Sequence, residues 1–137
     1  MFRLLGIDFG TVRIGLALSD PLKIISKPFK TLPNENIEQV TASLKKIIKE
    51  ESVGEIILGL PVNLDGDDTQ KTKEVRIFKE QLEKEINIPI HFQDERYTSS
   101  DAHTVIKKMK MTPQEGRKII DQIAASFILR NYMEKIR

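Results

Sequence analysis

Three carboxylates, far apart in the sequence, are the residues of this chain best suited to chemistry. Asp8 ends the apolar run LLGIDF, Glu95 follows a second short apolar run, and Asp121 lies within KIIDQIAASFIL. Carboxylates that converge repel one another and do not all ionise without a compensating charge. Mg²⁺ or Mn²⁺ supplies that charge and accepts oxygen ligands, and two such ions can promote phosphodiester cleavage. The first hypothesis is therefore a metal-dependent nuclease whose catalytic and metal-binding residues are Asp8, Glu95 and Asp121.

Each of these acids also has a simpler interpretation. Asp8 could be a turn residue, and Glu95 could form a local ion pair with Arg96. Asp121 lies four residues after Arg117, so the two could pair on an exposed helix surface. Only their combination in one fold favours a shared site.

Polar side chains and glycines near the same segment ends are candidates for binding a phosphate backbone. They are Gly10, Thr11, Arg13, Asn63, Asp65, Gly66, Arg96, Thr98 and Ser99. Asn63, Asp65 and Gly66 could equally form an Asx turn. The chain has no cysteine, which excludes disulfides and thiolate metal sites, and it has neither a Walker-type glycine loop nor a metal-binding histidine spacing.

The hydrophobic pattern predicts the elements that position these residues, in the order β-β-β-α-β-α-β-α-α. The predicted strands cover residues 2–9, 13–19, 24–32, 55–60 and 89–93. Apolar positions mark helices within residues 37–48, 75–86, 102–109 and 113–135. Gly10 lies in the tight connection between the first two strands, where we expect it to take a positive φ. Pro28 predicts that the third strand is an edge strand.

Strands separated by helices indicate parallel pairing with right-handed crossovers. We therefore expect an α/β fold with a five-stranded mixed sheet flanked by helices. The first three strands would be antiparallel, and the fourth and fifth would run parallel to a central first strand. Ligands bind where the carboxyl ends of parallel strands meet. Asp8 ends the first strand, and Asp94 and Glu95 end the last, so these acids belong to that edge. Ala124 and Ala125 would let the last helix approach the sheet and bring Asp121 to the same edge.

Composition predicts one globular domain, residues 1–137, with 39% hydrophobic and 31% charged residues. Nothing resembles a membrane span or a signal peptide, so the expected location is the cytoplasm. Residues 1–95 hold 13 Lys and Arg against 16 Asp and Glu, a net charge of −3, whereas residues 96–137 hold 9 against 4, a net charge of +5. This asymmetry suggests a nucleic acid held near a carboxylate site, or simply a solvated helix surface. The sequence leaves monomer and homodimer open.

Four motifs carry a family resemblance that covers nearly the whole chain. They are GIDFGTVRIGLALSD (6–20), GLPVNLDG (59–66), DERYTS (94–99) and IDQIAASFIL (120–129). The chain resembles the Holliday junction resolvase family of YqgF type, also described as pre-16S ribosomal RNA nucleases.

The resemblance implies a ribonuclease H-like fold and a divalent-metal nuclease site containing Asp8, Glu95 and Asp121. It implies that Arg13, Arg96 and Thr98 assist, and that the role is maturation of the 5′ end of 16S ribosomal RNA, with junction cleavage as the alternative. Relatives often carry Lys where this chain has Val12, and Thr where it has Ser99. Many ribonuclease H-like nucleases also carry an acid at the end of the fourth strand, where this chain reads LGLP, so Glu95 must substitute for it.

Two other classes compete with the nuclease. The segment DFGT is similar to the phosphate loop of sugar kinases and actin, but that nucleotide-binding fold needs two related domains. A non-catalytic RNA-binding module would bind RNA even without Asp8. The low aromatic content, 6%, argues against binding dominated by base stacking.

Overall fold

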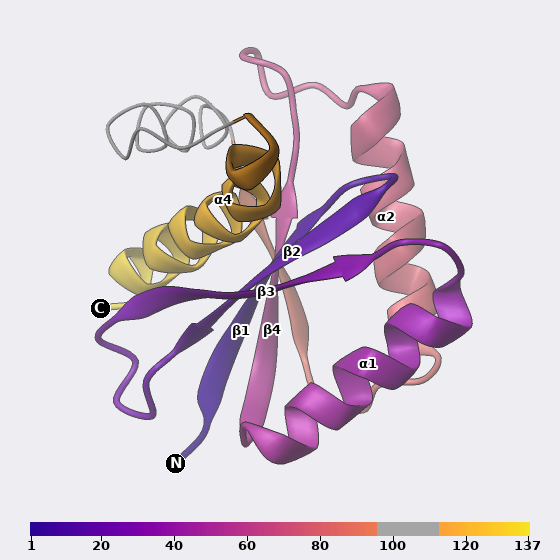
Figure 1. Ribbon diagram of the computed structural model, residues 1–137. Coiled ribbons are helices and arrows are strands. Elements are labelled where there is room, and N and C mark those ends of the chain that lie inside the picture. The colour runs from indigo at the N-terminus through magenta and orange to yellow at the C-terminus, as the bar shows by residue number, and fades with distance from the viewer. Residues whose placement is uncertain (96–112) are drawn as a thin grey trace.

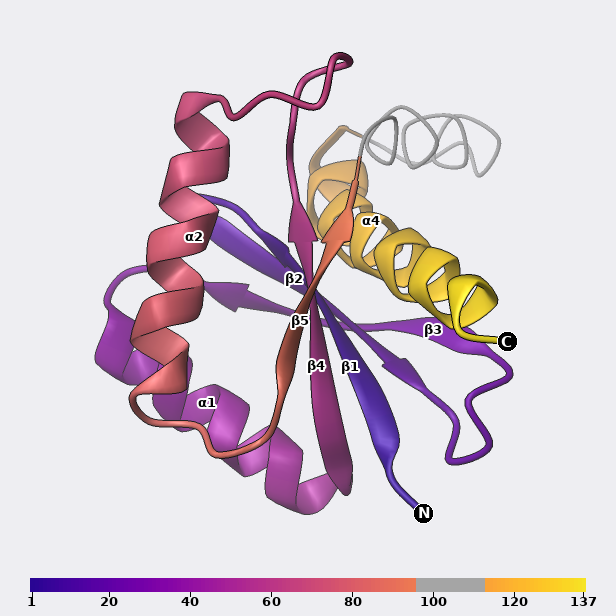
Figure 2. The same cartoon turned by 180° about the vertical axis from the view of Figure 1, so that it is seen from behind.

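A five-stranded mixed sheet runs through the centre of the molecule, with helices on both faces (Figures 1 and 2). The computed structural model describes residues 1–95 and 113–137. Its strands are β1 (Arg3–Phe9), β2 (Arg13–Ser19), β3 (Ser26–Pro33), β4 (Val53–Leu60) and β5 (Ile90–Asp94). Arg96, Thr98, Ser99 and the helix expected within residues 102–109 lie outside the described residues.

The strand order is β3-β2-β1-β4-β5, which confirms the predicted topology. β1 pairs antiparallel with β2 and parallel with β4, so it is the central strand. β3 is an edge strand, and its Pro28 pairs with Ala17 where the register shifts. Because proline cannot donate a ladder hydrogen bond, the edge is the position where it costs least.

Helices α1 (Ile37–Glu50) and α2 (Gln70–Glu83) cover one face of the sheet, and α4 (Pro113–Lys135) covers the other (Figure 1). The side chain of Asn36 caps α1 by accepting a hydrogen bond from the Gln39 backbone N–H at 2.9 Å. The larger part of the core lies beneath α1 and α2. Its fully buried members include Leu5, Ile7, Leu16, Leu44, Ile56, Leu58, Val75 and Leu82.

Glycines let α4 lie directly on the backbone of the sheet. A Cβ atom added at Gly6 would lie 2.8 Å from the carbonyl oxygen of Ala125, and one added at Gly15 would collide with the backbone of Asp121. The helix face that meets the sheet contains residues 121, 125, 128 and 129. The prediction is confirmed for Ala125, and Ala124 is buried in a separate cluster with Ile123.

The connection between β1 and β2 differs from expectation at Gly10. Its φ is not positive, so conformational freedom is not the reason for the glycine. A Cβ atom there would instead collide with the carbonyl oxygen of Arg13. Asn34 fixes the connection, since its side chain donates to the Gly10 carbonyl at 2.8 Å and its backbone N–H donates to the Val12 carbonyl at 2.9 Å.

Within the residues that the structure describes, no helix is both long enough and apolar enough to cross a bilayer.

Candidate active site

The strand ends bring Asp8 and Glu95 together. Asp8 lies in β1 opposite Gly15 of β2, near the end of the strand. The Glu95 backbone N–H donates to the Leu60 carbonyl at 3.2 Å, which extends the parallel pairing of β5 with β4 by one residue. The two carboxyl side chains form a hydrogen bond with each other, although they are far apart in the sequence.

Gly59 explains how Glu95 can serve in place of an acid on the fourth strand. A Cβ atom added at Gly59 would lie 3.0 Å from both Cδ and Oε2 of Glu95. The carboxyl group of Glu95 therefore reaches back from β5 and occupies the space above the end of β4. The LGLP segment carries no acid of its own, and the carboxyl group that lies at its end comes from the residue after β5.

Burial makes both carboxyl groups of this pair weaker acids than usual. Desolvation, followed by the charge of Asp8, raises the pKa of Glu95 from 4.5 to about 9. Desolvation also raises the pKa of Asp8 from 3.8 to about 6, while the Lys71 ammonium and the hydrogen bond from Glu95 oppose the rise. The pair titrates as a unit, so near neutral pH it holds one proton and one negative charge.

The raised pKa predicts how stability depends on pH when no divalent metal is present. Because the folded-state pKa of Glu95 lies above the unfolded value, its stabilising contribution is full below about pH 4.5 and is lost as pH rises toward 9. We expect the free energy of unfolding in EDTA to fall by roughly 5 kcal/mol between pH 5 and 9, since each unit of pKa shift corresponds to about 1.4 kcal/mol. Urea unfolding across this range measures the effect.

Glu95→Gln should flatten that pH profile, since the amide does not ionise. Glu80→Gln, a control at an exposed glutamate of α2, should leave the profile unchanged. Superimposable profiles for wild type and Glu95→Gln would contradict a raised pKa at this position.

Asp121 lies near the pair but is held by another partner. Its Oδ2 accepts a hydrogen bond from Nε of Arg13 at 2.8 Å, across 108 residues of sequence. The charge of Asp121 contributes to the raised pKa of Asp8, so the two carboxylates are within electrostatic reach. Even so, among residues 1–95 and 113–137 no three acidic or histidine side chains are close enough to hold one metal ion together. In this structure, therefore, Asp8 and Glu95 form a pair, whereas the carboxylate of Asp121 forms its ion pair with Arg13.

The donor atoms of the carboxyl pair fit a hard divalent cation. Oε1 of Glu95 is buried and has no hydrogen-bond partner among the described residues, and Glu95 itself is only 9% exposed. A buried oxygen without a partner is costly unless something positive reaches it. Mg²⁺ is commonly held by one or two carboxylates together with water and substrate phosphates. Two carboxylates are therefore a sufficient protein contribution.

A cleft of about 530 Å³ is lined by Asp121, but not by Asp8 or Glu95. Its lining includes Gly10, Thr11, Arg13, Lys71, Glu74 and Asp121. Gly10, Thr11 and Arg13 are among the predicted substrate-binding residues. Sequence analysis missed Lys71 and Glu74, because it took residues 62–70 as a loop and its helix pattern began only at Val75.

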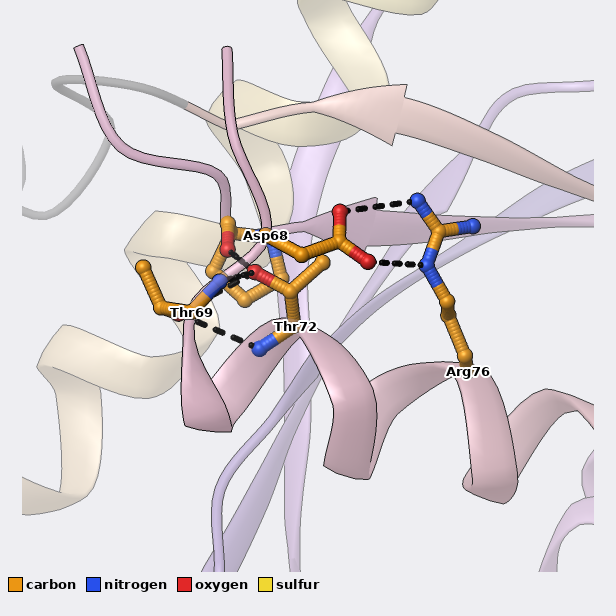
Figure 3. A network of polar contacts seen from close by, with 5 residues as sticks. Asp68, Thr69, Thr72 and Arg76 are labelled. Atoms are coloured by element: carbon orange, nitrogen blue, oxygen red, sulfur yellow. Dashed lines mark hydrogen bonds and ion pairs between the residues drawn. The ribbon is translucent and has the colours of Figure 1, made fainter. Parts of the chain in front are cut away.

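A polar network fixes the start of α2 against the end of β4 (Figure 3). Thr69 and Thr72 form a capping box, and the Thr72 hydroxyl donates to the Pro61 carbonyl oxygen. Arg76 donates two hydrogen bonds to the Asp68 carboxylate, at 3.0 and 3.1 Å. The threonine spacing, directly after a loop, is the sequence signal that marks this helix start. The network holds the first turn of α2, which contains Lys71, at the rim of the cleft.

The loop between β4 and α2 adopts an Asx turn. Oδ1 of Asn63 accepts hydrogen bonds from the backbone N–H groups of Asp65 and Asp67, at 3.0 and 2.8 Å. Gly66 has a φ of 87°, which favours glycine. Asn63, Asp65 and Gly66 do not line the cleft, so their contact with a substrate stays a prediction.

The fold matches that of known resolvases, which is ribonuclease H-like. RuvC of Thermus thermophilus aligns with a TM-score of 0.60 at 8% identity, over 98% of this chain and 96% of that chain. The fowlpox virus resolvase in complex with Holliday junction DNA aligns with a TM-score of 0.56 at 16% identity, over 98% of this chain and 99% of that chain. At such identities the likeness shows the fold alone.

Sequence comparison identifies the family. The model of the family described as RuvX, Holliday junction resolvase, matches residues 2–135, and the chain belongs to this family. Proteins named "Putative pre-16S rRNA nuclease" are similar over most of their length. The one from Koribacter versatilis is 39% identical over 97% of this chain and 87% of its own length. The one from Maridesulfovibrio salexigens is 39% identical over 97% of this chain and 98% of its own length.

Proposed function

We propose that this protein is a divalent-metal-dependent endonuclease of structured nucleic acid, and that its natural substrate is the 5′ precursor end of 16S ribosomal RNA. The observation that carries the proposal is the buried Asp8–Glu95 pair, in which Oε1 of Glu95 has no hydrogen-bond partner among the described residues, near a cleft lined by Arg13, Lys71 and Asp121. The names of the full-length relatives support the choice of substrate. The proposal treats residues 1–137 as one nuclease domain that works in the cytoplasm.

In this proposal Asp8 and Glu95 hold the metal, Mg²⁺ or Mn²⁺, and Asp121 is the third acid of the site. When bound, the metal lowers the pKa of the attacking water and stabilises the leaving oxygen. The shared proton leaves the carboxyl pair when the metal binds, because carboxylate ligands must be deprotonated. Burial of Glu95 keeps bulk water from screening the charges at this position.

The donors around the acids bind the substrate backbone. Arg13 is half-exposed, so it can exchange Asp121 for a phosphate oxygen and thereby release that carboxylate toward the metal. Thr11 adds a hydroxyl at the cleft. Arg96, Thr98 and Ser99 keep the substrate-binding roles expected from the sequence, where their side chains offer donors for phosphate oxygens.

Cleavage of four-way DNA junctions is the second candidate function. It is favoured by the description of the family model and by the fowlpox virus resolvase, whose structure contains junction DNA. A cleft lined by backbone-binding donors suits either nucleic acid, since phosphate contacts carry no sequence information.

The test is a cleavage assay on purified protein with both substrates side by side. Precursor RNA with its 5′ extension and a four-way DNA junction are incubated with Mg²⁺, Mn²⁺ or EDTA. We expect metal-dependent cutting of the RNA and none in EDTA. Cutting of the junction alone would favour the resolvase role. Binding without cutting in every metal would contradict an enzyme, and ATP binding in its place would favour the nucleotide-binding class.

A further inference from the structure

Lys71 is a cation at the candidate active site that has no assigned role. It projects from the first turn of α2 and lines the same cleft as Arg13 and Asp121, which come from β2 and α4. Arg76 and Lys79 on the same helix form ion pairs with Asp68 and Glu83. Within the described part of the chain, no carboxylate lies within ion-pairing distance of the Lys71 ammonium. Its charge is therefore available to a ligand.

The charge of Lys71 acts on the acid pair. Its ammonium lowers the pKa of both Asp8 and Glu95, against the stronger effect of burial. A lysine that influences both carboxyl groups lies within electrostatic reach of the place where a phosphate must be cleaved. Other charged groups of the cleft are Glu74, Asp121 and Arg13, and the last two already bond to each other.

The position of Lys71 is fixed by its neighbour in the sequence. The hydroxyl of Thr72 donates to the Pro61 carbonyl oxygen directly after β4, and Thr69 closes the capping box (Figure 3). The backbone of Lys71 is thereby anchored to the strand that ends beneath the carboxyl group of Glu95. Only its four-carbon side chain stays adjustable, which suits a compact charge that must follow a phosphate oxygen.

We propose that Lys71 binds a phosphate oxygen of the nucleic-acid backbone and positions the scissile phosphodiester between α2 and the Asp8–Glu95 pair. The inference rests on the proposed nuclease function and adds the residue that holds the substrate from the α2 side. Arg13 contacts the backbone from the β2 side. The scissile phosphodiester then lies between two cations and beside two acids.

The test compares Lys71→Met with a matched control on the same helix. Lys73→Met removes the same charge two residues further on, at an exposed position that does not line the cleft. We expect Lys71→Met to lower kcat/KM for precursor RNA by about 10- to 100-fold, the cost of one charge-assisted hydrogen bond. Lys71→Arg should recover part of the loss, and Lys73→Met should stay within about twofold of wild type.

A second measurement separates substrate binding from a structural role. Binding of fluorescently labelled precursor RNA is followed in EDTA over a range of salt concentrations. Lys71→Met should reduce the slope of log K against log salt by roughly one unit, while Tm stays unchanged. Wild-type slope and wild-type cleavage for Lys71→Met would overturn the proposal. If wild type binds RNA but does not cut it, the nuclease function fails, while the slope still decides the role of Lys71.

Discussion

Asp8→Asn is expected to reduce metal-dependent cleavage by ~10³-fold or more, because several kcal/mol of transition-state charge stabilisation are lost and each 1.36 kcal/mol is a factor of ten. The amide keeps the shape of the carboxyl group but not its charge. Asp8 interacts with both of the other acids. It shares a hydrogen bond with Glu95, and the charge of Asp121 contributes to its raised pKa. Single-turnover cleavage of precursor RNA at saturating Mg²⁺ measures the loss of the chemical step.

The same variant should fold and bind RNA normally. Asp8→Asn removes a buried charge, so the free energy of unfolding in EDTA should not decrease at neutral pH. Asp67→Asn is the matched control, since it makes the same change at an exposed acid of the loop after β4. If Asp8→Asn cuts within tenfold of wild type while Asp67→Asn also does, Asp8 is not a metal ligand.

The sheet could be predicted because its signals are local. The order of the elements follows from the apolar runs of five to eight residues and the turn residues between them. The edge position of β3 follows from Pro28. The connection rules then place β1 between the hairpin and the parallel strands. Strand limits differed by only one or two residues, which is the usual uncertainty at element ends.

The meeting of Asp8 and Glu95 could also be anticipated, because parallel strands end at one edge. The pairing of Asp121 with Arg13 could not, since it depends on the angle at which α4 crosses the sheet. Sequence analysis missed Lys71 for another reason. The first residues of α2 are polar and its first apolar residue is Val75, so the hydrophobic pattern begins after Lys71.

Three glycines that sequence analysis left without an interpretation determine how closely other elements approach the sheet. Gly6, Gly15 and Gly59 lie on three neighbouring strands, and each leaves room for an atom of another element. At Gly59 that atom belongs to the carboxyl group of Glu95 or to Ile128. At Gly6 and Gly15 it belongs to α4. Gly15 and Gly59 thus make room for Asp121 and Glu95, two of the three acids. The hydrophobic periodicity of the sequence does not predict this close packing.

Gly15→Ala is therefore expected to destabilise the protein strongly and to impair cleavage. The added Cβ would collide with the backbone of Asp121 and would lie 2.7 Å from its Cβ, and a helix backbone cannot move aside as a side chain can. We expect a loss of about 3 kcal/mol, the upper end for overpacking, and a Tm lower by about 10 °C. Thermal and urea unfolding measure the loss, and cleavage well below the Tm reports the displacement of Asp121.

Gly54→Ala provides the matched comparison for this prediction. Its Cβ would meet the ring of Phe2, a side chain 38% exposed near the chain end, which can swing into solvent. The same methyl group on another strand of the sheet, β4, should therefore cost less than about 1 kcal/mol and leave cleavage unchanged. Equal stability losses for Gly15→Ala and Gly54→Ala would mean that the cost comes from the strand backbone itself. In that case the close approach of α4 would not be what places Asp121 beside Asp8.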